Sequence, residues 1–463
     1  MQYVSTRGEA PELGFEDVLL TGLARDGGLY VPKAWPQMSP DELRSLRGRS
    51  YQDVAYHVVS KFMGHAIPEA ELMQMIAEAY ATFGHPAVVP LKQLGANQWL
   101  LELFHGPTLS FKDVAMQLLA RLMDWSLARR KSRATIVGAT SGDTGGAAID
   151  AFKNSRYATT IILHPHGRVS DVQRRQMTTV DSPVIHNIAI EGNFDDCQMI
   201  LKALFNDPGF RDRVGLAGVN SINWARIMAQ IVYYVSSAVS LGSPDRKVSF
   251  CVPTGNFGDI FAGYVAKRMG VPIDRLIIAT NVNDILDRTL RTGRYEMKGV
   301  HPSTSPSMDI QVSSNFERLL YLAYDRDAAA IRGLMSGLSQ SGAFTIGKKE
   351  LAAIRAEFDS FAVNEAECAK TIAQTLKATG ELLDTHTAVG FAAAQRAKSG
   401  NGAMVTLATA HPAKFPDAVE KASGLRPHLP QRLSHLLNAK EHFTILPNSA
   451  TAVRDFVLAL HKA

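Results

Sequence analysis

Lys112 lies in an unusual setting for a lysine, among apolar and hydroxyl residues at the point where a helix is predicted to begin. The surrounding segment, residues 103–113, reads LFHGPTLSFKD. Most lysines are solvated surface groups, and that is the alternative here. Burial and nearby cations, however, lower the pKa of a lysine amine and make it nucleophilic, as Schiff-base chemistry requires. We therefore treat Lys112 as a candidate nucleophile.

A glycine-containing loop at residues 253–259, PTGNFGD, follows a predicted strand and opens a predicted helix. Gly255 and Gly258 allow a ligand to approach the backbone closely, and the start of a helix favours a phosphate group. The loop matches neither the GxGxxG nor the GxxxxGK[ST] nucleotide pattern. It therefore predicts a phosphate site for a ligand other than a nucleotide held in those ways. A similar string, GNFD at 192–195, lacks the second glycine, and we interpret it as a helix N-cap.

A second polar loop, TSGDTGG at residues 140–146, also joins a predicted strand to a predicted helix. The free N–H groups of that helix can hold an anion. An ordinary N-cap followed by a turn is the alternative. A reactive lysine and a phosphate loop on an α/β scaffold are together the minimum that pyridoxal phosphate needs.

Strands that alternate with helices of about a dozen residues predict parallel α/β layers with helices on both faces. The predicted strands lie at 133–140, 159–163, 184–190, 247–252, 275–280 and 403–408, and helices at 145–153, 194–205 and 259–269 follow three of them. Helical periodicity at 51–62 and 68–83 predicts a mostly helical N-terminal unit, and residues 313–378 read as helices without strong strand signals. We expect three parts: 1–90, a smaller α/β part at 91–205, and a larger one at 206–463.

The composition narrows the class of protein. The chain has 463 residues and a formal charge of +5, and its basic clusters are too short to indicate nucleic-acid binding. No run approaches the roughly 18 apolar residues of a membrane span, and the first residues have no signal-peptide core. Three scattered cysteines, Cys197, Cys251 and Cys368, fit a reducing compartment, and no metal-ligand spacing is present. We expect a cytoplasmic protein without a metal site.

Six motifs in order resemble the threonine synthase family of the bacterial and fungal type. They are LELFHGPTLSFKD, ATSGDTGGAA, NSINWARIMAQIVYY, VPTGNFGD, ATNVND and TAHPAKF, and with DGGLYVP near the N-terminus they cover most of the chain. The resemblance implies fold type II of the pyridoxal-phosphate enzymes, the tryptophan synthase β-like group. It also implies a carbon–oxygen lyase that converts O-phospho-L-homoserine and water to L-threonine and phosphate by γ-elimination and β-addition of water, the final step of threonine biosynthesis.

The resemblance implies roles for residues on the cofactor side. Lys112 matches the lysine that carries the cofactor, and Thr409 matches the hydroxyl residue facing the pyridine nitrogen. Asp143 stands near the cofactor's 3′-oxygen, where related enzymes often have Asn, so the protonation of this pair is open. The residues that match the cofactor phosphate loop are Gly255, Asn256, Phe257, Gly258 and Asp259.

On the substrate side, the resemblance implies a carboxylate site and a separate phosphate site. Thr140, Ser141 and Thr144 match the loop that takes the carboxylate. Ser221, Asn223 and Arg226 match positions that hold the phosphate, and Arg168 is a further candidate. His166 stands where some relatives carry Arg. No partner beyond this small-molecule substrate is expected, and the chain is expected to be a monomer or a homodimer.

Two alternatives remain open at this point. Another fold type II enzyme, such as a serine or threonine dehydratase, needs no second phosphate site, so Arg226 and Ser221 distinguish it. A non-catalytic protein that binds a phosphate ligand is the alternative from another class. An ordinary salt bridge remains the structural alternative for Arg226.

Overall fold

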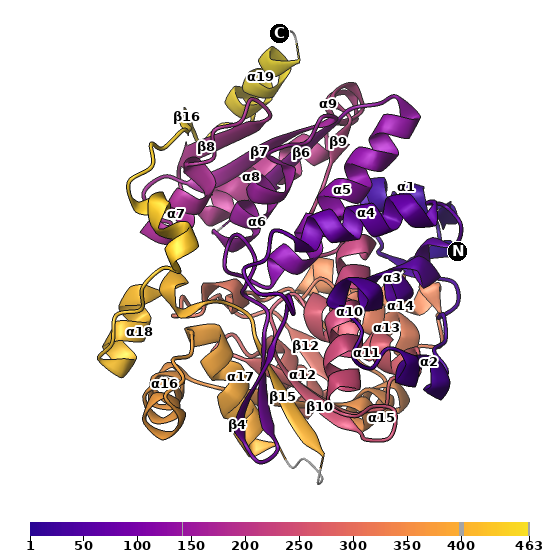
Figure 1. The fold of residues 1–463 in the computed structure, drawn as a ribbon. Helices are drawn as coiled ribbons and strands as arrows, with labels where there is room; N and C mark the ends of the chain where they lie inside the picture. Colours follow the sequence, from indigo (N-terminus) through magenta and orange to yellow (C-terminus); the bar gives the residue numbers. More distant parts are fainter. Residues whose placement is uncertain (141, 398–401, 462–463) are drawn as a thin grey trace.

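Two parallel-stranded sheets form the framework of the molecule (Figure 1). The computed structural model describes residues 1–140, 142–397 and 402–461. The larger sheet has six strands in the order β14-β11-β10-β15-β5-β4, and all of its pairings are parallel except β4 with β5. These strands are β4 (Leu91–Gly95), β5 (Gln98–Glu102), β10 (Val248–Pro253), β11 (Ile273–Thr280), β14 (Phe358–Ala362) and β15 (Ala403–Ala408).

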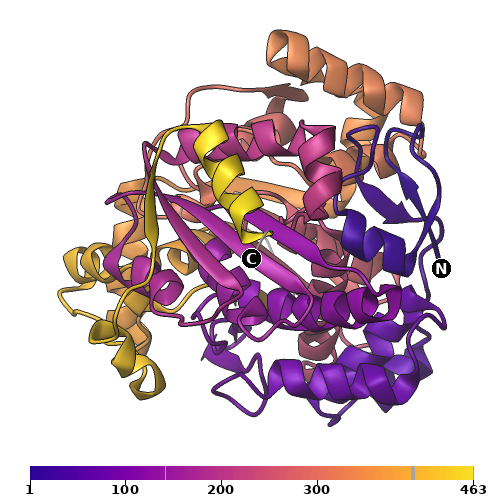
Figure 2. The same ribbon diagram turned by 90° about the horizontal axis from the view of Figure 1, so that it is seen from above.

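The smaller sheet has five strands in the order β16-β8-β7-β6-β9, all paired in parallel. They are β6 (Ala134–Ala139), β7 (Ala158–Pro165), β8 (Ile185–Glu191), β9 (Leu216–Ala217) and β16 (Thr444–Pro447). Seen from above, the C-terminal helix α19 (Ala450–Leu460) lies over this sheet (Figure 2). The parallel α/β layers expected from the sequence are thus confirmed.

Alternate residues of the central strands enter different apolar cores, which places helices on both faces of each sheet. In β10, Phe250 and Val252 pack in the core that contains α11 (Gly258–Arg268), whereas Cys251 packs with α17 (Thr385–Arg396). In the smaller sheet, Ile136 packs with α6 (Asp143–Phe152) and Val137 with α8 (Phe194–Phe205). Successive side chains of a strand point to opposite faces, so each sheet is covered twice.

The N-terminal unit is mostly helical, as predicted, and it adds a small antiparallel sheet that the sequence did not indicate. Its helices are α1 (Phe15–Thr21), α2 (Pro40–Ser45), α3 (Tyr51–Met63) and α4 (Glu69–Tyr80), and its strands, in sheet order, are β2 (Leu13–Gly14), β1 (Gln2–Ser5) and β3 (Tyr30–Pro32). A capping box between Ser50 and Asp53 starts α3, which buries Val54, Val58 and Phe62 on one face. That spacing is why the prediction at 51–62 held.

The remaining helices connect or cover the two sheets. Those in the first two thirds of the chain are α5 (Lys112–Arg130), α7 (Asp171–Thr178), α9 (Pro208–Val214), α10 (Trp224–Ser240), α12 (Ile285–Thr292) and the short η1 (Pro306–Met308). The others are α13 (Phe316–Ala323), α14 (Ala328–Ser341), α15 (Lys348–Glu357), α16 (Glu365–Thr379), η2 (Pro412–Lys414), α18 (Pro416–Ser423) and η3 (Gln431–Leu437). Helix α5 packs against α4, α6 and α10, and so links the N-terminal unit to both layers.

Two expectations from the sequence need correction. Residues 313–378 are not purely helical: they contain β13 (Ala343–Thr345), which pairs with β12 (Arg294–Glu296), and the edge strand β14. Only Phe358 of β14 is fully buried, so the strand has a weak apolar pattern. The expected boundaries at 90/91 and 205/206 also differ from the division between the sheets. Residues 91–102 belong to the larger sheet and 444–447 to the smaller one, because strand pairing joins segments distant in sequence.

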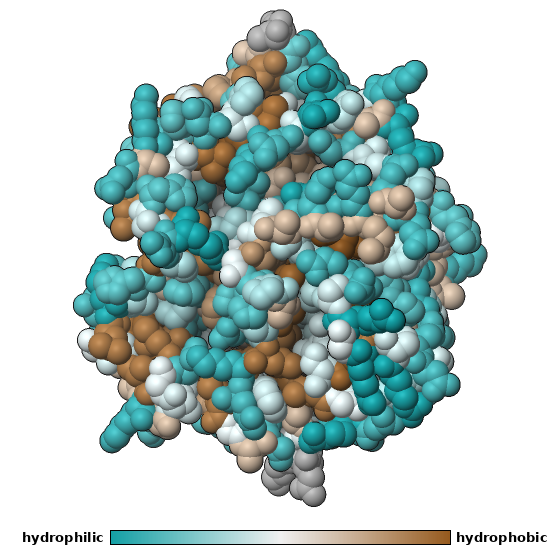
Figure 3. Space-filling model, in the orientation of Figure 1, coloured by the Kyte–Doolittle hydropathy of each residue, from teal (hydrophilic) through white to brown (hydrophobic). Residues whose placement is uncertain are grey.

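The outer surface is largely hydrophilic on the face shown in Figure 3, where hydrophobic side chains gather in separate patches. Throughout the described part of the chain, no helix has both the length and the apolar character needed to cross a bilayer.

Candidate active site

Lys112 is the first residue of α5, and a short antiparallel contact fixes its position. The N–H of Phe111 donates to the carbonyl of Thr409 at 2.9 Å. Ser110 and Ala410 form an isolated β-bridge beside it. The residues just before Lys112 are therefore aligned with the segment that follows β15, and Thr409 lies at the start of α5.

The Lys112 amine is buried and faces one carboxylate and one hydroxyl group. Its Nζ donates to Asp143 Oδ2 at 3.2 Å and to Ser307 Oγ at 3.4 Å. Burial lowers the pKa of Lys112, Asp143 opposes that change, and the cations Lys414 and Arg226 add to it. A lowered pKa increases the neutral fraction of the amine, which is the form that acts as a nucleophile or a base.

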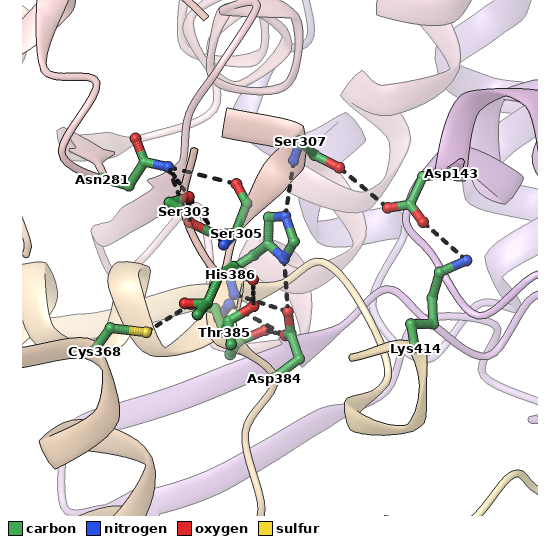
Figure 4. A network of polar contacts seen from close by, with 12 residues as sticks. Asp143, Asn281, Ser303, Ser305, Ser307, Cys368, Asp384, Thr385, His386 and Lys414 are labelled. Atoms are coloured by element: carbon green, nitrogen blue, oxygen red, sulfur yellow. Dashed lines mark hydrogen bonds and ion pairs between the residues drawn. The ribbon is translucent and has the colours of Figure 1, made fainter. Parts of the chain in front are cut away.

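Asp143, the first residue of α6, is the centre of the polar network (Figure 4). Its Oδ1 lies 3.0 Å from Lys414 Nζ and accepts from Gln173 Nε2 at 2.8 Å, and Ser307 Oγ donates to Oδ2 at 3.2 Å. Burial alone would raise the pKa of this carboxyl, but the Lys414 and Lys112 cations outweigh it and hold the pKa well below its ordinary value. Asp143 is thus ionised, and it acts only as an acceptor.

A buried histidine–aspartate pair holds the backbone of Ser307 (Figure 4). The N–H of Ser307 donates to His386 Nε2 at 3.2 Å, and His386 Nδ1 lies 3.0 Å from Asp384 Oδ1. Since Nε2 accepts a hydrogen bond, the ring proton lies on Nδ1 and is donated to Asp384. Asp384 in turn caps α17 by accepting from the N–H of His386 at 2.9 Å.

The segment that carries Ser307 is folded around Asn281, in the motif ATNVND. Asn281 Nδ2 donates to Ser303 Oγ at 2.8 Å, to Ser305 Oγ at 3.0 Å and to Asp309 Oδ1 at 2.7 Å (Figure 4 shows the two serines). The motif therefore helps to position Ser307 through the residues on either side of it.

The loop at 253–259 leaves the start of α11 without a side-chain cap. Phe257 takes the N-cap position in the left-handed conformation, with φ 63°. A Cβ added to Gly255 would lie 2.8 Å from the carbonyl oxygen of Ser307, so only glycine fits there. The uncapped N–H groups of α11 are suited to an anionic group.

Asp259, the last residue of the expected cofactor phosphate loop, has its side chain engaged by α10. Its carboxylate accepts hydrogen bonds from Tyr233 and, at 2.9 Å, from Tyr234 on α10. Burial raises the pKa of Asp259 to about 6. The side chain thus packs against α10, and what this residue offers a ligand is its backbone N–H.

Arg226, on the first turn of α10, is buried without an acidic partner. Its Nη1 donates to the carbonyl of Val219 at 3.1 Å, and its Nε has no protein partner. Burial lowers the pKa of Arg226 to about 10. No carboxylate of the described residues lies within ion-pair distance of Arg226, so the ordinary salt bridge considered for it is absent there.

The two segments expected to hold the two phosphates lie side by side. Asn315 Nδ2 donates to the carbonyl of Ser221 at 3.2 Å and to that of Asn256 at 3.0 Å. A Cβ added to Gly258 would lie 3.6 Å from the Ser221 carbonyl oxygen. The start of α11 and the turn before α10 therefore border one region.

Other residues expected at the substrate have local roles. Asn223 caps α10 by accepting from the N–H of Ala225 at 2.9 Å, and its amide donates to the Leu19 carbonyl at 3.0 Å. The Thr140 hydroxyl accepts from the N–H of Gly142 at 2.9 Å and of Gly145 at 3.0 Å. Residues that follow a strand or open a helix commonly satisfy backbone groups in this way, and the parts of Asn223 and Thr140 in binding stay predictions.

The last expected residues vary in exposure. Thr144 and Ser221 are half-buried, whereas Arg168 and His166 are exposed beyond the end of β7. Ser141 lies outside the described residues. The sequence reasoning missed Lys414, Ser307 and Gln173. The motif TAHPAKF contains Lys414, and a lysine inside an apolar motif was the available signal.

The charge balance of this site fits an anionic cofactor and an anionic substrate. Three cations, Lys112, Lys414 and Arg226, are buried, and Asp143 is the carboxylate that lies between two of them. Buried charge is costly unless it is compensated. The uncapped start of α11, the amine of Lys112 and the cation excess therefore fit pyridoxal phosphate, with its phosphate and aldehyde groups.

Comparison with known proteins supports the same conclusion. Profiles described as "Threonine synthase N terminus", "Pyridoxal-phosphate dependent enzyme" and "Threonine synthase, C-terminal" match residues 2–80, 82–410 and 387–457. Threonine synthase of Pseudomonas aeruginosa is 53% identical over 459 residues, covering 99% of this chain and 98% of the relative. That of Saccharomyces cerevisiae is 41% identical over 481 residues, covering 95% and 94%.

Solved structures extend the similarity to three dimensions. The pyridoxal-phosphate-bound threonine synthase of Brucella melitensis is 61% identical, with a TM-score of 0.98 and full coverage of both chains. The yeast enzyme is 38% identical, with a TM-score of 0.94 over 100% of this chain and 99% of the other. With profiles spanning most of its length and relatives matched end to end, this chain belongs to the threonine synthase family of pyridoxal-phosphate enzymes.

Proposed function

We propose that this chain converts O-phospho-L-homoserine and water to L-threonine and phosphate, with pyridoxal phosphate held at Lys112. The observation that carries the proposal is the buried amine of Lys112, which has a lowered pKa and lies between Asp143 and Ser307. The related proteins from Brucella melitensis and Pseudomonas aeruginosa are threonine synthases.

The cofactor, when bound, supplies an electron sink for the substrate carbon next to the amine. Lys112 acts as the base that takes and returns protons at the substrate, because burial lowers the pKa of its amine and so favours the neutral form. The ionised Asp143 would accept a hydrogen bond from the bound cofactor, and Thr409, whose carbonyl accepts from the N–H of Phe111 beside Lys112, would offer it a hydroxyl group. The N–H groups at the start of α11 would hold the cofactor phosphate.

Arg226 binds the substrate phosphate in this proposal. Its guanidinium is buried with a free Nε, and its planar set of donors suits phosphate oxygens. A serine or threonine dehydratase acts on a substrate without that group, so a second buried cation site favours the phosphate ester. The tomato threonine deaminase matches at 15% identity with a TM-score of 0.54, which is a likeness of fold alone.

Incubation with O-phospho-L-homoserine, with phosphate and threonine assayed together, tests the function. Equal amounts of both products are expected. Phosphate without threonine, or a 2-oxo acid with ammonia, would overturn the proposal in favour of another fold type II reaction. Purified protein should also show a visible absorption band that borohydride removes, and the Lys112→Ala variant should lack it. A normal band in that variant would exclude Lys112 as the cofactor lysine.

A cytoplasmic location and a monomeric or dimeric state, with no nucleic-acid partner, remain part of the proposal. The buried, unpaired state of Cys197, Cys251 and Cys368 supports a reducing compartment.

A further inference from the structure

Lys414 is fixed within the protein, although a lysine is ordinarily a solvated, flexible residue. Its side chain is 0% exposed. Its Nζ donates to the Thr108 carbonyl at 2.6 Å and to Gln176 Oε1 at 2.8 Å, and lies 3.0 Å from Asp143 Oδ1. These three acceptors match the three donors of an ammonium group, so the charge is held in one place.

The two lysines engage different oxygens of Asp143. Lys414 lies against Oδ1 at 3.0 Å, and Lys112 lies against Oδ2 at 3.2 Å (Figure 4 shows the Lys414 side). Asp143 is therefore compensated by Lys414 whether or not Lys112 carries a charge. Without Lys414, deprotonation of Lys112 would leave a buried carboxylate with no cation beside it, which is a costly state.

We propose that Lys414 is a positioning residue for the threonine synthase reaction: its ammonium group keeps Asp143 ionised and in place while Lys112 gives up its proton. The inference rests on the proposed role of Lys112 as the cofactor lysine. When the Lys112 ammonium releases its proton to solvent, the Lys414–Asp143 pair stays neutral overall, and no further charge has to move.

Other groups face these three residues from each neighbouring element. Lys112 is faced by Arg226 of α10, Ser307 of η1 and Asp259 of α11. Asp143 is faced by Gln173 of α7 and His386 of α17. Lys414 is faced by Gln176 of α7 and Asp113 of α5. Arg226 acts in the same direction as Lys414. Thr108 donates to both oxygens of Asp113, whose pKa is raised to about 6 by burial. Asp143 is thus the carboxylate that contacts both lysines.

The test measures how fast the apoprotein captures pyridoxal phosphate, followed by visible absorbance, as a function of pH. Capture needs the neutral amine of Lys112, and the titration of free cofactor is common to all variants. In Lys414→Met the midpoint should rise by about one pH unit or more, the scale on which a single nearby charge moves a pKa. Arg432→Met is the matched control: this cation donates to the carbonyls of His105 and Gly106 beside the same loop, and its loss should leave the midpoint in place.

Two more variants distinguish charge compensation from a merely structural effect. Asp143→Asn should lower the midpoint, because Lys112 then loses the carboxylate that it contacts while Lys414 and Arg226 remain. The double variant Asp143→Asn/Lys414→Met removes one charge of each sign and should return the midpoint toward the wild-type value. If Lys414→Met does not fold, the upward shift from Asp143→Asn to the double variant carries the test.

An unchanged midpoint in Lys414→Met, or in the double variant relative to Asp143→Asn, would overturn the inference. Apoprotein with Lys112→Ala, run in parallel, separates this failure from failure of the proposed function. Capture by that variant would remove Lys112 from its role, whereas its absence together with an unmoved Lys414→Met midpoint refutes only the role of Lys414.

Discussion

Two Gly-Asn-Phe strings start two helices of this chain in opposite ways. At α8 the side chain of Asn193 accepts from the N–H of Asp196 at 3.0 Å, and the Asp196 carboxylate accepts from the N–H of Asn193 at 2.7 Å. This capping box closes the helix end. At α11 the N-cap is Phe257, and no side chain caps the helix.

The residues after the shared string account for the difference. At α8 an aspartate stands at the third helical position and turns back to the N-cap. At α11 the corresponding start is Gly258-Asp259, and the carboxylate of Asp259 is engaged by Tyr233 and Tyr234. The same three residues thus make a closed structural cap in one place and an open anion site in the other, depending on where the next carboxylate is directed.

Lys112→Ala should have the largest effect on activity at the site that includes the start of α11. The variant loses the amine beside Asp143, so threonine formation should stop while the fold is retained. The exposed Lys202 of α8 provides the matched control, and Lys202→Ala should keep full activity. Turnover and circular dichroism measure the two effects. Normal threonine formation by Lys112→Ala would remove this residue from the site.

Gly255→Val tests whether the Gly-Asn-Phe sequence before α11 contributes to cofactor binding. The added side chain meets the Ser307 carbonyl at a Cβ distance of 2.8 Å. Overpacking of this kind costs about 1–3 kcal/mol, and if this cost falls on the cofactor site, affinity for pyridoxal phosphate should fall by about fivefold or more. The matched change at α8 is Gly192→Val, whose Cβ would first meet the Asp196 side chain rather than backbone.

Titration of both apoproteins with the cofactor measures the contrast. Gly192→Val should bind as the wild type does. Equal losses of affinity in the two variants would mean that the two strings do not differ in function.

Arg226→Ala tests whether the open site extends to a second phosphate. Losing a charge-assisted hydrogen bond costs about 1.5–3 kcal/mol, so apparent substrate affinity should fall by about tenfold or more. Cofactor binding should be retained. Steady-state kinetics and a cofactor titration separate the two properties, and Arg211→Ala on α9, beside α8, is the control because this arginine is exposed. Loss of cofactor with unchanged substrate constants would reverse the assignment.

Asn193→Ala and Asn256→Ala should give the smallest effects and the most direct contrast. Loss of the Asn193 cap should lower the free energy of unfolding by about 1 kcal/mol without changing cofactor affinity. Asn256 caps no helix, so Asn256→Ala should stay within about 0.5 kcal/mol in urea denaturation. A larger loss of stability in Asn256→Ala than in Asn193→Ala would contradict the structural distinction.

The sequence predicted most of the fold because the central strands and helices carry strong local signals. The helix at 194–205 and the start of a helix at Lys112 are found at the expected residues. Strands β4, β5 and β14 lie at or near a sheet edge with mixed exposure, and their membership depends on pairing with distant strands rather than on local pattern.

The site was predictable only where chemistry coincides with a motif. Lys112 and the 253–259 loop have distinctive neighbours, and the cap at 193 has a carboxylate at the right spacing. Ser307 reaches Lys112 only because Asn281 folds the intervening segment, and no local pattern reports that. The side-chain oxygen of Asn223 caps α10, and its part in binding stays a prediction.

The pairing of β16 with β8 has a consequence for how the protein is made. The chain contributes residues 91–102 to the larger sheet, 134–217 to the smaller, 248–408 to the larger again, and 444–447 to the smaller. A ribosome therefore releases the last strand of the smaller sheet only after the whole larger sheet has been synthesised. Neither sheet can be produced as a continuous fragment that lacks strands of the other. Removing about twenty residues from the C-terminus would remove β16, an edge strand of the smaller sheet, and Asp143 begins the helix that follows β6 of the same sheet.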